Sequence, residues 1–578
     1  MAMGPHRLQA ISRSAEQAES RAGNPPGWRS ALRQALHERS LLGLVAGTVL
    51  LGASLTPSLT PRPPELMGVL AGICLAMGYL AGIAVQAAYS FLGFALPQVR
   101  GGLTRLMVTA CAGFAAAFFW LSIDWQNQLR TLFDLPPLGR GSVFVVVAVA
   151  IATFGMLFLI GVGCRALYRI TSAWFDKRVP RRVAIVLGVA VSGLVVWALL
   201  SGVLFRFGLR LFDSSFREVD ALVEPDVIAP GDPFQTGSPA SLIEWDSLGR
   251  MGRQYISTGP TTAEIEAVAG GADARPVRVY AGLNSAETAT DRARLALAEL
   301  KRVGGFDRSV LVIVAPTGTG WVDPNAIDTL EFLHRGDVAS VAVQYSYLAS
   351  WLSLTVEPDY GVESAKALFR EVYAYWTQLP RDSRPRLYLF GLSLGALSSE
   401  QSMDLFDVIE DPIQGALWAG PPFPSPLWNS ATANREPGTP VWLPRFKDSS
   451  IVRFTSQRNN LNRAGDRWGP IRIVYLQYGS DPITFFRPDS FYRRPEWLTD
   501  PRAPDVLPSL RWVPGVTFMQ TAVDLMTAAV TPTGTGHVYA AEHYLDGWVA
   551  VTDAPGWSEP AITKLRETVA EKYADPGS

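Results

Sequence analysis

Ser393 is the residue of this chain with the clearest potential for chemistry. It lies at the centre of a Gly-x-Ser-x-Gly sequence, residues 391–395, the pattern of a sharp turn that exposes a nucleophilic serine. The pattern alone is weak evidence, but the apolar run 387–390 predicts a strand before it, and "ALSSEQSMDLFDVIE" (396–410) predicts a helix after it. A strand, a turn and a helix in this order would present the hydroxyl for attack on an ester or thioester carbonyl.

The residues around Ser393 fit such a turn. Gly391 and Gly395 are expected because a strained serine leaves no room for β-carbons on its neighbours. The backbone N–H of Leu394 would then point at the oxyanion that develops during attack. The alternative is an ordinary glycine-rich turn that happens to contain a serine.

A second oxyanion donor is expected from the loop "APTGTGWVDP" (315–324), which follows an earlier predicted strand. Thr317, Gly318 or Thr319 would supply the backbone N–H. The glycines of this loop do not indicate a phosphate site, because no Gly-Lys-Ser/Thr follows them.

Two histidines remain as candidates for the general base. In the fold that uses this turn, the chain order is serine, acid, histidine. That order excludes three of the five histidines, namely His6, His37 and His334. His537 lies in a glycine-rich loop, "TPTGTGHVYAAEHY" (531–544), and is preferred over His543, which begins a predicted helix.

Asp481 is the preferred acid, because it directly follows the apolar run of "IRIVYLQYGSDPITFF" (471–486). Its role would be to orient the imidazole and to stabilise the imidazolium. The alternative is that Asp481 only caps a turn through its Asp-Pro pair. Asp489 is the second choice. Three other aspartates follow the serine too closely: Asp404, Asp407 and Asp411.

The N-terminal third of the chain is predicted to lie in a membrane. Hydrophobic residues make up 48% of the chain and charged residues 18%, with a mean hydropathy of +0.14, which is apolar for a soluble enzyme. After a tail, residues 1–39, a transmembrane domain is expected over residues 40–206. Its five apolar stretches, each long enough to span a bilayer, are Leu41–Leu59, Leu66–Leu96, Leu106–Ile123, Ser142–Cys164 and Val183–Phe205.

The charges of the loops predict the orientation of these spans. Arginines and lysines concentrate in the N-terminal tail and in the loop 165–182. Five alternating spans place these two segments on the same side, which the positive-inside rule makes cytoplasmic. The C-terminal domain then lies outside the cell membrane, with the first span as a signal anchor. Within the spans, the pairs Gly43/Gly47, Gly68/Gly72 and Gly78/Gly82 are spaced for helix contact, either inside one bundle or, less favoured, between two copies of the chain.

After a linker and lead-in, residues 207–270, the remaining residues 271–578 are predicted to form an α/β catalytic domain. Apolar runs alternate with helical patterns, which indicates a mainly parallel sheet with helices on both faces. The predicted strands lie in 276–283, 309–316, 338–347, 384–391, 413–420 and 471–480. Helices are predicted over 291–303 and 361–379. The regions 421–470 and 485–515 exceed a minimal domain and are interpreted either as a cap over a lipidic substrate or as ordinary loops.

Other composition features exclude several kinds of partner. A net charge of −1 gives no support for nucleic-acid binding. The three cysteines, Cys74, Cys111 and Cys164, all lie in apolar runs, so neither a disulfide framework nor a cysteine metal site is expected in the C-terminal two-thirds. The proposed chemistry requires no metal and no organic cofactor.

Seven stretches together resemble the bacterial membrane-bound α/β-hydrolase family with an N-terminal multi-pass transmembrane domain. These stretches are "SLTPSLTPRPP" (54–64), residues 241–261, "FGLSLGALSSE" (390–400), "YLQYGSDPI" (475–483), "RRPEWL" (493–498), residues 511–525 and "GTGHVYAAEHYLDGW" (534–548). The resemblance implies an α/β-hydrolase fold, a serine nucleophile at Ser393 and a histidine at His537, and it does not identify a substrate. One departure is that no clear strand precedes His537, since "WVPGVTFM" (512–519) suits a helix start as well as a strand.

These observations predict a membrane-anchored serine hydrolase that acts on lipid-like or acylated envelope esters or thioesters. The bilayer and such a substrate are its expected partners, and its oligomeric state is left open. Acyl transfer by the same triad, a non-catalytic membrane scaffold and a transporter with an accessory domain remain alternatives. No charge lies at the centre of a predicted span, so nothing in the sequence specifically favours transport.

Overall fold

The computed structural model describes residues 40–94, 101–198, 220, 227–348, 358–404, 408–462, 466–554 and 556–574. The chain divides into two compact units. One comprises Met1–Gly52, Met67–Phe119 and Phe144–Arg210, and the other Ala53–Leu66, Trp120–Val143 and Leu211–Ser578. The second unit therefore includes two short segments that connect apolar helices, as well as the whole sheet. The predicted N-terminal tail lies outside the described residues.

The first unit consists mainly of apolar helices. They are α3 Leu41–Ser54, α4 Pro64–Phe91, α5 Gly101–Leu132, α6 Ser142–Asp176 and α7 Arg181–Ala198. Among these, α4 to α7 are long and apolar enough to cross a membrane, so the chain is a multi-pass membrane protein. Helix α3 is shorter than predicted, because it ends at Ser54 and the proline-containing residues 55–63 form a loop. Its 14 residues span about 21 Å, against a hydrocarbon core of about 30 Å.

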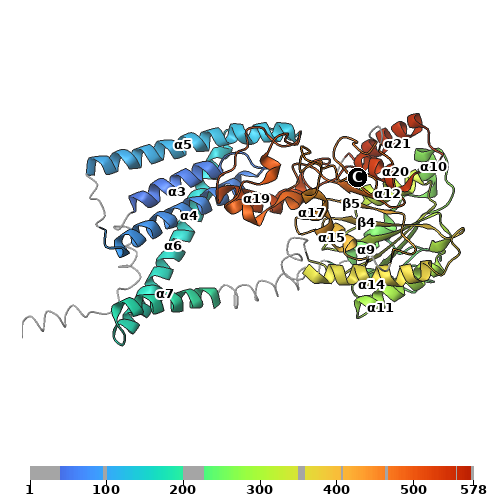
Figure 1. Ribbon diagram of the computed structural model, residues 1–578, viewed down its shortest axis with the longest axis horizontal. Helices are drawn as coiled ribbons and strands as arrows, with labels where there is room; N and C mark the ends of the chain where they lie inside the picture. The colour runs from blue at the N-terminus through green and yellow to red at the C-terminus, as the bar shows by residue number, and fades with distance from the viewer. Residues whose placement is uncertain are drawn as a thin grey trace, which may run out of the picture. The chain divides into compact units, whose positions relative to one another are not determined.

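The glycine pairs of the apolar helices pack within the bundle, as the favoured reading predicts. A β-carbon on Gly82 would lie 2.4 Å from the Cα of Gly43, so α3 and α4 are in backbone contact there. A β-carbon on Gly68 would lie 2.6 Å from the Cβ of Val149 on α6. Figure 1 shows α3 lying alongside α4. The small residues thus permit the close helix approach on which packing in lipid depends.

Seven strands in the described residues form one parallel sheet, which confirms the predicted fold class. They are β1 Val277–Ala281, β2 Val310–Ala315, β3 Val338–Val343, β4 Arg386–Leu392, β5 Gly415–Ala419, β6 Val452–Thr455 and β7 Arg472–Leu476, in the order β1-β3-β2-β4-β5-β7-β6. Strand β6 was not expected, because its four residues at the sheet edge are too short for a clear pattern. The central strands are buried on both faces, so their sequences are continuous apolar runs.

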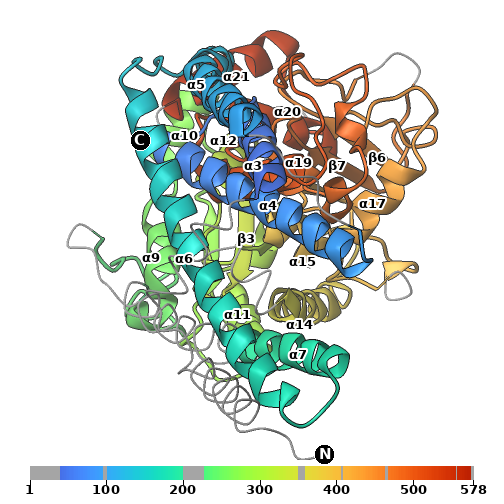
Figure 2. The ribbon, with the colours of Figure 1, turned by 90° about the vertical axis from the view of Figure 1, so that its left-hand side faces the viewer.

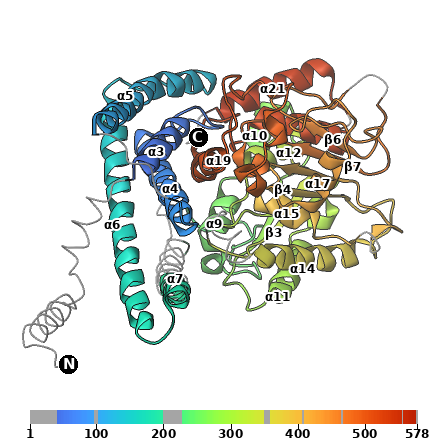
Figure 3. The same ribbon diagram turned by 60° about the vertical axis from the view of Figure 1, so that its left-hand side comes forward.

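Helices cover both faces of the sheet. Helices α11 (Ala289–Arg302), α14 (Pro358–Trp376) and α15 (Leu394–Glu400) pack together on one face, and α12 (Pro324–Leu333), α20 (Ala541–Thr552) and α21 (Glu559–Lys572) pack on the other. Figures 2 and 3 show the pair α11 and α14 on the opposite side of the strands from α12. The remaining helices are α9 Gly249–Ser257, α10 Thr262–Ala269, α17 Pro426–Ala433, α18 Pro482–Phe485 and α19 Val516–Thr527, with 3-10 turns η2 Trp245–Leu248, η3 Gly305–Asp307, η4 Pro488–Phe491, η5 Glu496–Leu498 and η6 Ala528–Val530.

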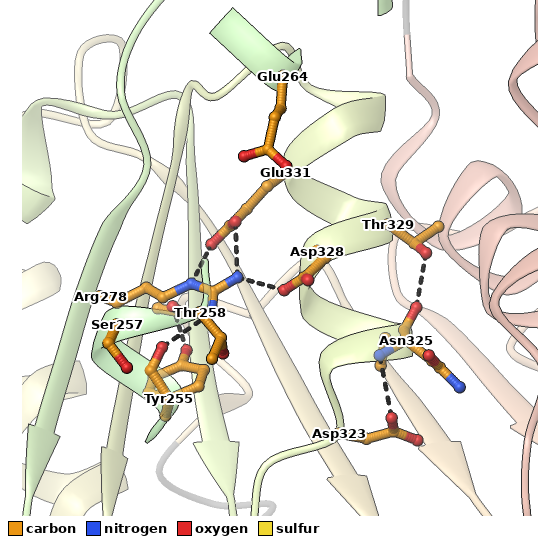
Figure 4. Close-up of polar contacts among 12 residues, drawn as sticks. Tyr255, Ser257, Thr258, Glu264, Arg278, Asp323, Asn325, Asp328, Thr329 and Glu331 are labelled. Atoms are coloured by element: carbon orange, nitrogen blue, oxygen red, sulfur yellow. Dashed lines mark hydrogen bonds and ion pairs between the residues drawn. The ribbon is translucent and has the colours of Figure 1, made fainter. Parts of the chain in front are cut away.

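The segment expected as a lead-in, from residue 227 onward, packs on this sheet. Helix α9 contacts β1, and the carbonyl of Tyr255 accepts a hydrogen bond of 2.9 Å from Arg278 on β1. The same guanidinium donates two bonds of 2.8 Å to Glu331 and a further bond to Asp328, both on α12 (Figure 4). Arg278 therefore ties α9, β1 and α12 together at the amino end of the strands, and burial raises the pKa of Glu331 to about 7 despite this pairing.

A buried ion pair joins the loop between α3 and α4 to α19, and both belong to the unit that contains the sheet. Arg62 Nε lies 2.8 Å from Oδ1 of Asp524 on α19, and the two side chains are 1% and 0% exposed. Asp524 also accepts bonds from the Ser58 hydroxyl at 2.9 Å and the Leu59 N–H at 3.1 Å. The carboxylate thus has three donors from one loop, which offsets the cost of burying its charge.

Replacing Arg62 with alanine is expected to destabilise this unit by about 3–5 kcal/mol, because the carboxylate of Asp524 stays buried without its countercharge. Thermal unfolding of the full chain in detergent micelles would show this as a Tm lowered by several degrees. Arg140→Ala is the matched control, since Arg140 pairs with Asp124 at 2.6 Å while 49% and 43% of the two side chains are exposed. Such exposed pairs contribute about 0–1 kcal/mol, so equal Tm shifts in the two variants would contradict the expectation.

Candidate active site

Ser393 forms the turn between β4 and α15. Its φ is 58° and its ψ −125°, a conformation that costs a non-glycine residue on the order of 1–3 kcal/mol. The backbone N–H of Ser393 donates to Ala419 O at the end of β5, at 3.0 Å. This bond to the neighbouring strand helps to hold the serine in its strained conformation at the carboxyl edge of the sheet.

The two glycines of the motif are required sterically, as predicted. A β-carbon on Gly391 would lie 2.3 Å from the carbonyl of Gly395, on the other side of the turn. A β-carbon on Gly395 would lie 2.1 Å from Ala315 O, at the end of β2. The sharp turn can therefore form only because the two glycines of the motif, Gly391 and Gly395, lack side chains.

The helix after the serine is shorter than the sequence predicts. Helix α15 ends at Glu400, residues 401–404 form a turn, and residues 405–407 lie outside the described part of the chain. Leu394 is the first residue of this helix. The first amides of a helix have no intrahelical acceptor, so the N–H of Leu394 is suited to the predicted oxyanion role.

Asp481 and His537 are joined by a hydrogen bond of 2.7 Å between Oδ2 and Nδ1. The carboxylate is completely buried. Oδ1 caps α18 by accepting the N–H of Ile483 at 2.8 Å, and Oδ2 also accepts the hydroxyl of Tyr539 at 2.7 Å. Oδ1 thus caps the turn, as the alternative for Asp481 predicts, while Oδ2 is the oxygen that faces His537, as the triad prediction requires.

The bond to Asp481 determines which nitrogen of His537 can act as a base. A carboxylate only accepts hydrogen bonds, so Nδ1 carries the proton and Nε2 has the free lone pair. His537 is 8% exposed, and its Nε2 has no hydrogen-bond partner in the part of the chain that the structure describes. The structure therefore joins the acid and the histidine, but it shows no hydrogen bond between Nε2 of His537 and the hydroxyl of Ser393. In proteins of this kind such catalytic bonds are often long without substrate and shorten when the substrate is bound.

Ser393 and His537 are held against adjacent residues of one strand end. Ser393 is bonded to Ala419, and Gly420 is the next residue. A β-carbon on Gly420 would lie 2.5 Å from Cε1 and 2.9 Å from Nδ1 of His537. The sequence analysis did not identify Gly420. The signal that could have done so is a glycine directly between the end of a strand and Pro421-Pro422.

No strand lies between β7 and His537 in the described residues. Residues 512–519, which suited a helix start as well as a strand, contain the start of a helix, because α19 begins at Val516. The loop is held instead by individual bonds. The N–H of His537 donates to Ala528 O at 3.1 Å, and the N–H of Gly536 donates to the hydroxyl of Ser480 at 3.0 Å. Because Ser480 precedes Asp481, the acid and the histidine are positioned by the same pair of loops.

His543, the second choice for the base, has a different role. Its Nδ1 accepts the hydroxyl of Tyr478 at 2.6 Å, and burial lowers the pKa of His543 to about 4. The ring of Tyr478 stacks on Tyr539 with a centroid distance of 4.3 Å. His543 therefore remains neutral and contacts Tyr478, whose ring stacks on Tyr539, the residue that bonds Asp481. Both tyrosines were missed because an aromatic residue near a strand end is usually core.

Asp489, the alternative acid, lies in η4, where Oδ1 is 3.2 Å from Nε of Arg487. A different buried acid, Asp323, lies at the start of α12 and was not considered. Asp323 accepts the hydroxyl of Tyr544 at 2.9 Å, and burial raises its pKa to about 7. Its Oδ1 accepts the N–H of Asn325 at 3.0 Å, and the side chain of Asn325 donates to Tyr539 O at 3.0 Å.

The loop expected to supply the second oxyanion donor lies beside the start of α15, but one of its amides is already engaged. The N–H of Thr317 donates to Trp321 O at 2.9 Å, which removes this amide from the expected donors. The hydroxyl of Thr317 lies 3.3 Å from that of Thr319. The oxyanion role of Gly318 and Thr319 stays a prediction.

Two family models match the chain. Residues 277–565, half of the 578 residues, match the Alpha/beta-hydrolase family, and residues 55–260 match the Alpha/beta-hydrolase family N-terminus. Curated proteins and solved structures give no significant match. The second match begins in the loop that carries Arg62 and extends over α4 to α7, so the apolar helices are part of the family's architecture. With its parallel sheet, its strained serine turn and these matches, the chain belongs to the alpha/beta-hydrolase family.

Proposed function

We propose that this protein is a membrane-anchored serine hydrolase that cleaves esters or thioesters through an acyl-enzyme. The observation that carries the proposal is the hydrogen bond between Asp481 and His537, which leaves Nε2 of His537 unpaired beside the strand end that holds Ser393. A structural histidine in this position would need a donor for Nε2, whereas a catalytic one needs the serine hydroxyl.

In the first half of the reaction, Oγ of Ser393 attacks the carbonyl carbon while Nε2 of His537 takes the hydroxyl proton. Asp481 stabilises the imidazolium without accepting the proton. The oxyanion of the tetrahedral intermediate accepts bonds from the N–H of Leu394 and from the 317–319 loop, with Gly318 as the proposed second donor. The intermediate collapses, the C–O or C–S bond breaks, and the leaving alcohol or thiol takes the proton from His537.

In the second half, water attacks the acyl-serine ester and gives a proton to Nε2 of His537. Collapse of the second intermediate releases the acid and returns the proton to Ser393. An alcohol or amine in place of the water would make the same enzyme an acyltransferase. Hydrolysis is the simpler proposal, because it requires no acceptor site.

The proposed substrates are lipid-like or acylated envelope esters, and the proposed location of the catalytic unit is the extracytoplasmic side. Support comes from the loop between α6 and α7 together with the first turn of α7, which contain Lys177, Arg178, Arg181 and Arg182. The positive-inside rule places this loop in the cytoplasm. One crossing by α7 then brings the following chain to the outer face, where envelope esters are found.

A fluorophosphonate probe tests the proposal against the non-catalytic scaffold. The full chain in detergent micelles is expected to form one covalent adduct, which peptide mass mapping would locate on Ser393. The same chain denatured by heat is the control and should not react, because a free serine hydroxyl is a weak nucleophile. Absence of an adduct in the native chain, or an adduct on a different serine, would contradict the proposal.

A further inference from the structure

A cavity of about 190 Å³ lies among the segments that exceed the minimal domain. Its walls come from α17, from α18 and from the chain around η4 and η5. Apolar rings of Trp428, Phe485 and Trp497 form part of its lining.

The charged residues of this cavity are mainly arginines. Four line it, Arg435, Arg487, Arg493 and Arg494, together with two acids, Asp489 and Glu496. Each acid pairs with one arginine: Glu496 with Arg435 at 3.0 Å, and Asp489 with Arg487 at 3.2 Å. Arg493 and Arg494 have no carboxylate within ion-pair distance among the described residues, so the lining carries an excess of two positive charges.

An oxyanion would neutralise the two arginines that have no carboxylate partner, through charge-assisted hydrogen bonds. Thr432 on α17 also lines the cavity, but its Oγ1 is buried with almost no accessible surface. The arginines, rather than this hydroxyl, are therefore the groups that would contact an anion.

The cavity shares residues with the catalytic elements. Thr484 lines it and donates its hydroxyl to Oδ2 of Asp481 at 3.2 Å. The start of α17 is bonded to the end of the serine helix, because the N–H of Leu427 donates to Glu400 at 3.2 Å. Both α17 and α18 follow strand ends at the carboxyl edge of the sheet, the edge on which Ser393 lies.

We propose that this cavity binds an anionic group of the substrate, a phosphate or carboxylate carried next to the scissile ester. The inference rests on the proposed hydrolase function and narrows its substrate class. Arg493 and Arg494 provide the charge and the hydrogen-bond donors, and the aromatic rings contact the adjoining carbon atoms. A phospholipid headgroup and a soluble phosphorylated ester share this chemistry.

Two chromogenic esters of similar length test the selectivity of the full chain in neutral detergent. 4-Nitrophenyl hemisuccinate carries a carboxylate, whereas 4-nitrophenyl butyrate is neutral. The ratio of kcat/KM for the anionic ester to that for the neutral ester is expected to fall about ten-fold in the double variant Arg493→Gln/Arg494→Gln, chiefly through KM. Arg370→Gln, an exposed position on α14, is the control and should keep the wild-type ratio. An unchanged ratio in the double variant would overturn the proposal.

Binding to the Ser393→Ala chain separates this proposal from the function itself. Calorimetric titration with monomeric dihexanoyl phosphatidylglycerol, and separately with inorganic phosphate, should show binding that the two arginine substitutions remove. Tighter binding of the lipid would identify a headgroup site, and tighter binding of phosphate a site for soluble esters. If the anion binds but the wild type hydrolyses no ester, the proposed hydrolase function is refuted and the anion site stands. If the wild type hydrolyses esters but no anion binds, only the proposed anion site is refuted.

Discussion

Replacing Ser393 with alanine is expected to lower kcat for ester hydrolysis by about 10⁵–10⁶-fold, because the acyl-enzyme can no longer form. The residual rate would come from the oxyanion donors and from substrate binding. The serine is only 4% exposed, and its backbone is held by the bond to Ala419 and by the two flanking glycines. Alanine has the same backbone requirements as serine, so the variant should fold and keep the wild-type Tm.

The measurement is hydrolysis of 4-nitrophenyl butyrate by the purified full chain, with Tm recorded on the same samples. Ser398→Ala is the matched control, because Ser398 is a buried serine of the same helix, 3% exposed, and has no part in the proposed mechanism. Loss of activity in both variants would point to damage of α15 rather than to a missing nucleophile. More than about one per cent of wild-type kcat in Ser393→Ala would contradict the proposed mechanism.

Replacing Asp481 with asparagine is expected to lower kcat by about 10⁴-fold, through a change of histidine tautomer. The N–H of Ile483 requires an acceptor at the Oδ1 position, at 2.8 Å. The asparagine amide would therefore place its NH₂ group at the Oδ2 position, facing Nδ1 of His537. Nδ1 would become the acceptor and Nε2 would carry the proton, so His537 could no longer take the proton of Ser393.

Steady-state kinetics with the same neutral ester would measure this loss, and Asp489→Asn serves as the control. Asp489 was the second candidate for the acid, and in the structure it pairs with Arg487 instead of with the histidine. Asp489 also lines the proposed anion cavity, which the neutral ester does not need, so the control should retain a kcat near that of the wild type with this ester. A large loss in Asp489→Asn together with an active Asp481→Asn would reverse the assignment.

Much of the domain could be predicted from local sequence patterns. The strands around the serine are continuous apolar runs because both faces of the sheet are covered, and the alternation of strands with helices indicates parallel topology. Gly391 and Gly395 identified the turn because their lack of side chains is a local steric requirement. Chain order then reduced the histidines to two, and the position of Asp481 after a strand selected the acid.

The placement of His537 depended on contacts that no local pattern records. A strand normally carries this histidine, but here α19 precedes it. Gly420 leaves space for the imidazole ring, and the hydroxyl of Ser480 accepts the N–H of Gly536 in the histidine loop. Tyr539 donates to Asp481, and Tyr478 stacks on Tyr539. The glycine-rich loop already favoured His537 over His543, and the structure adds the reason: His537 is bonded to Asp481, whereas His543 is bonded to Tyr478.

Sequence patterns alone predicted the fold class, the apolar helices, the serine turn and the three candidate triad residues, because each depends on periodicity, steric requirements or chain order. Only the tertiary structure decided that Thr317 uses its amide within its own loop and that the loop carrying Arg62 belongs to the unit that contains the sheet. Arg62 and Asp524 are 462 residues apart. A buried ion pair over such a separation forms only when the folded chain excludes water from both partners, so its energy is not contained in either segment alone.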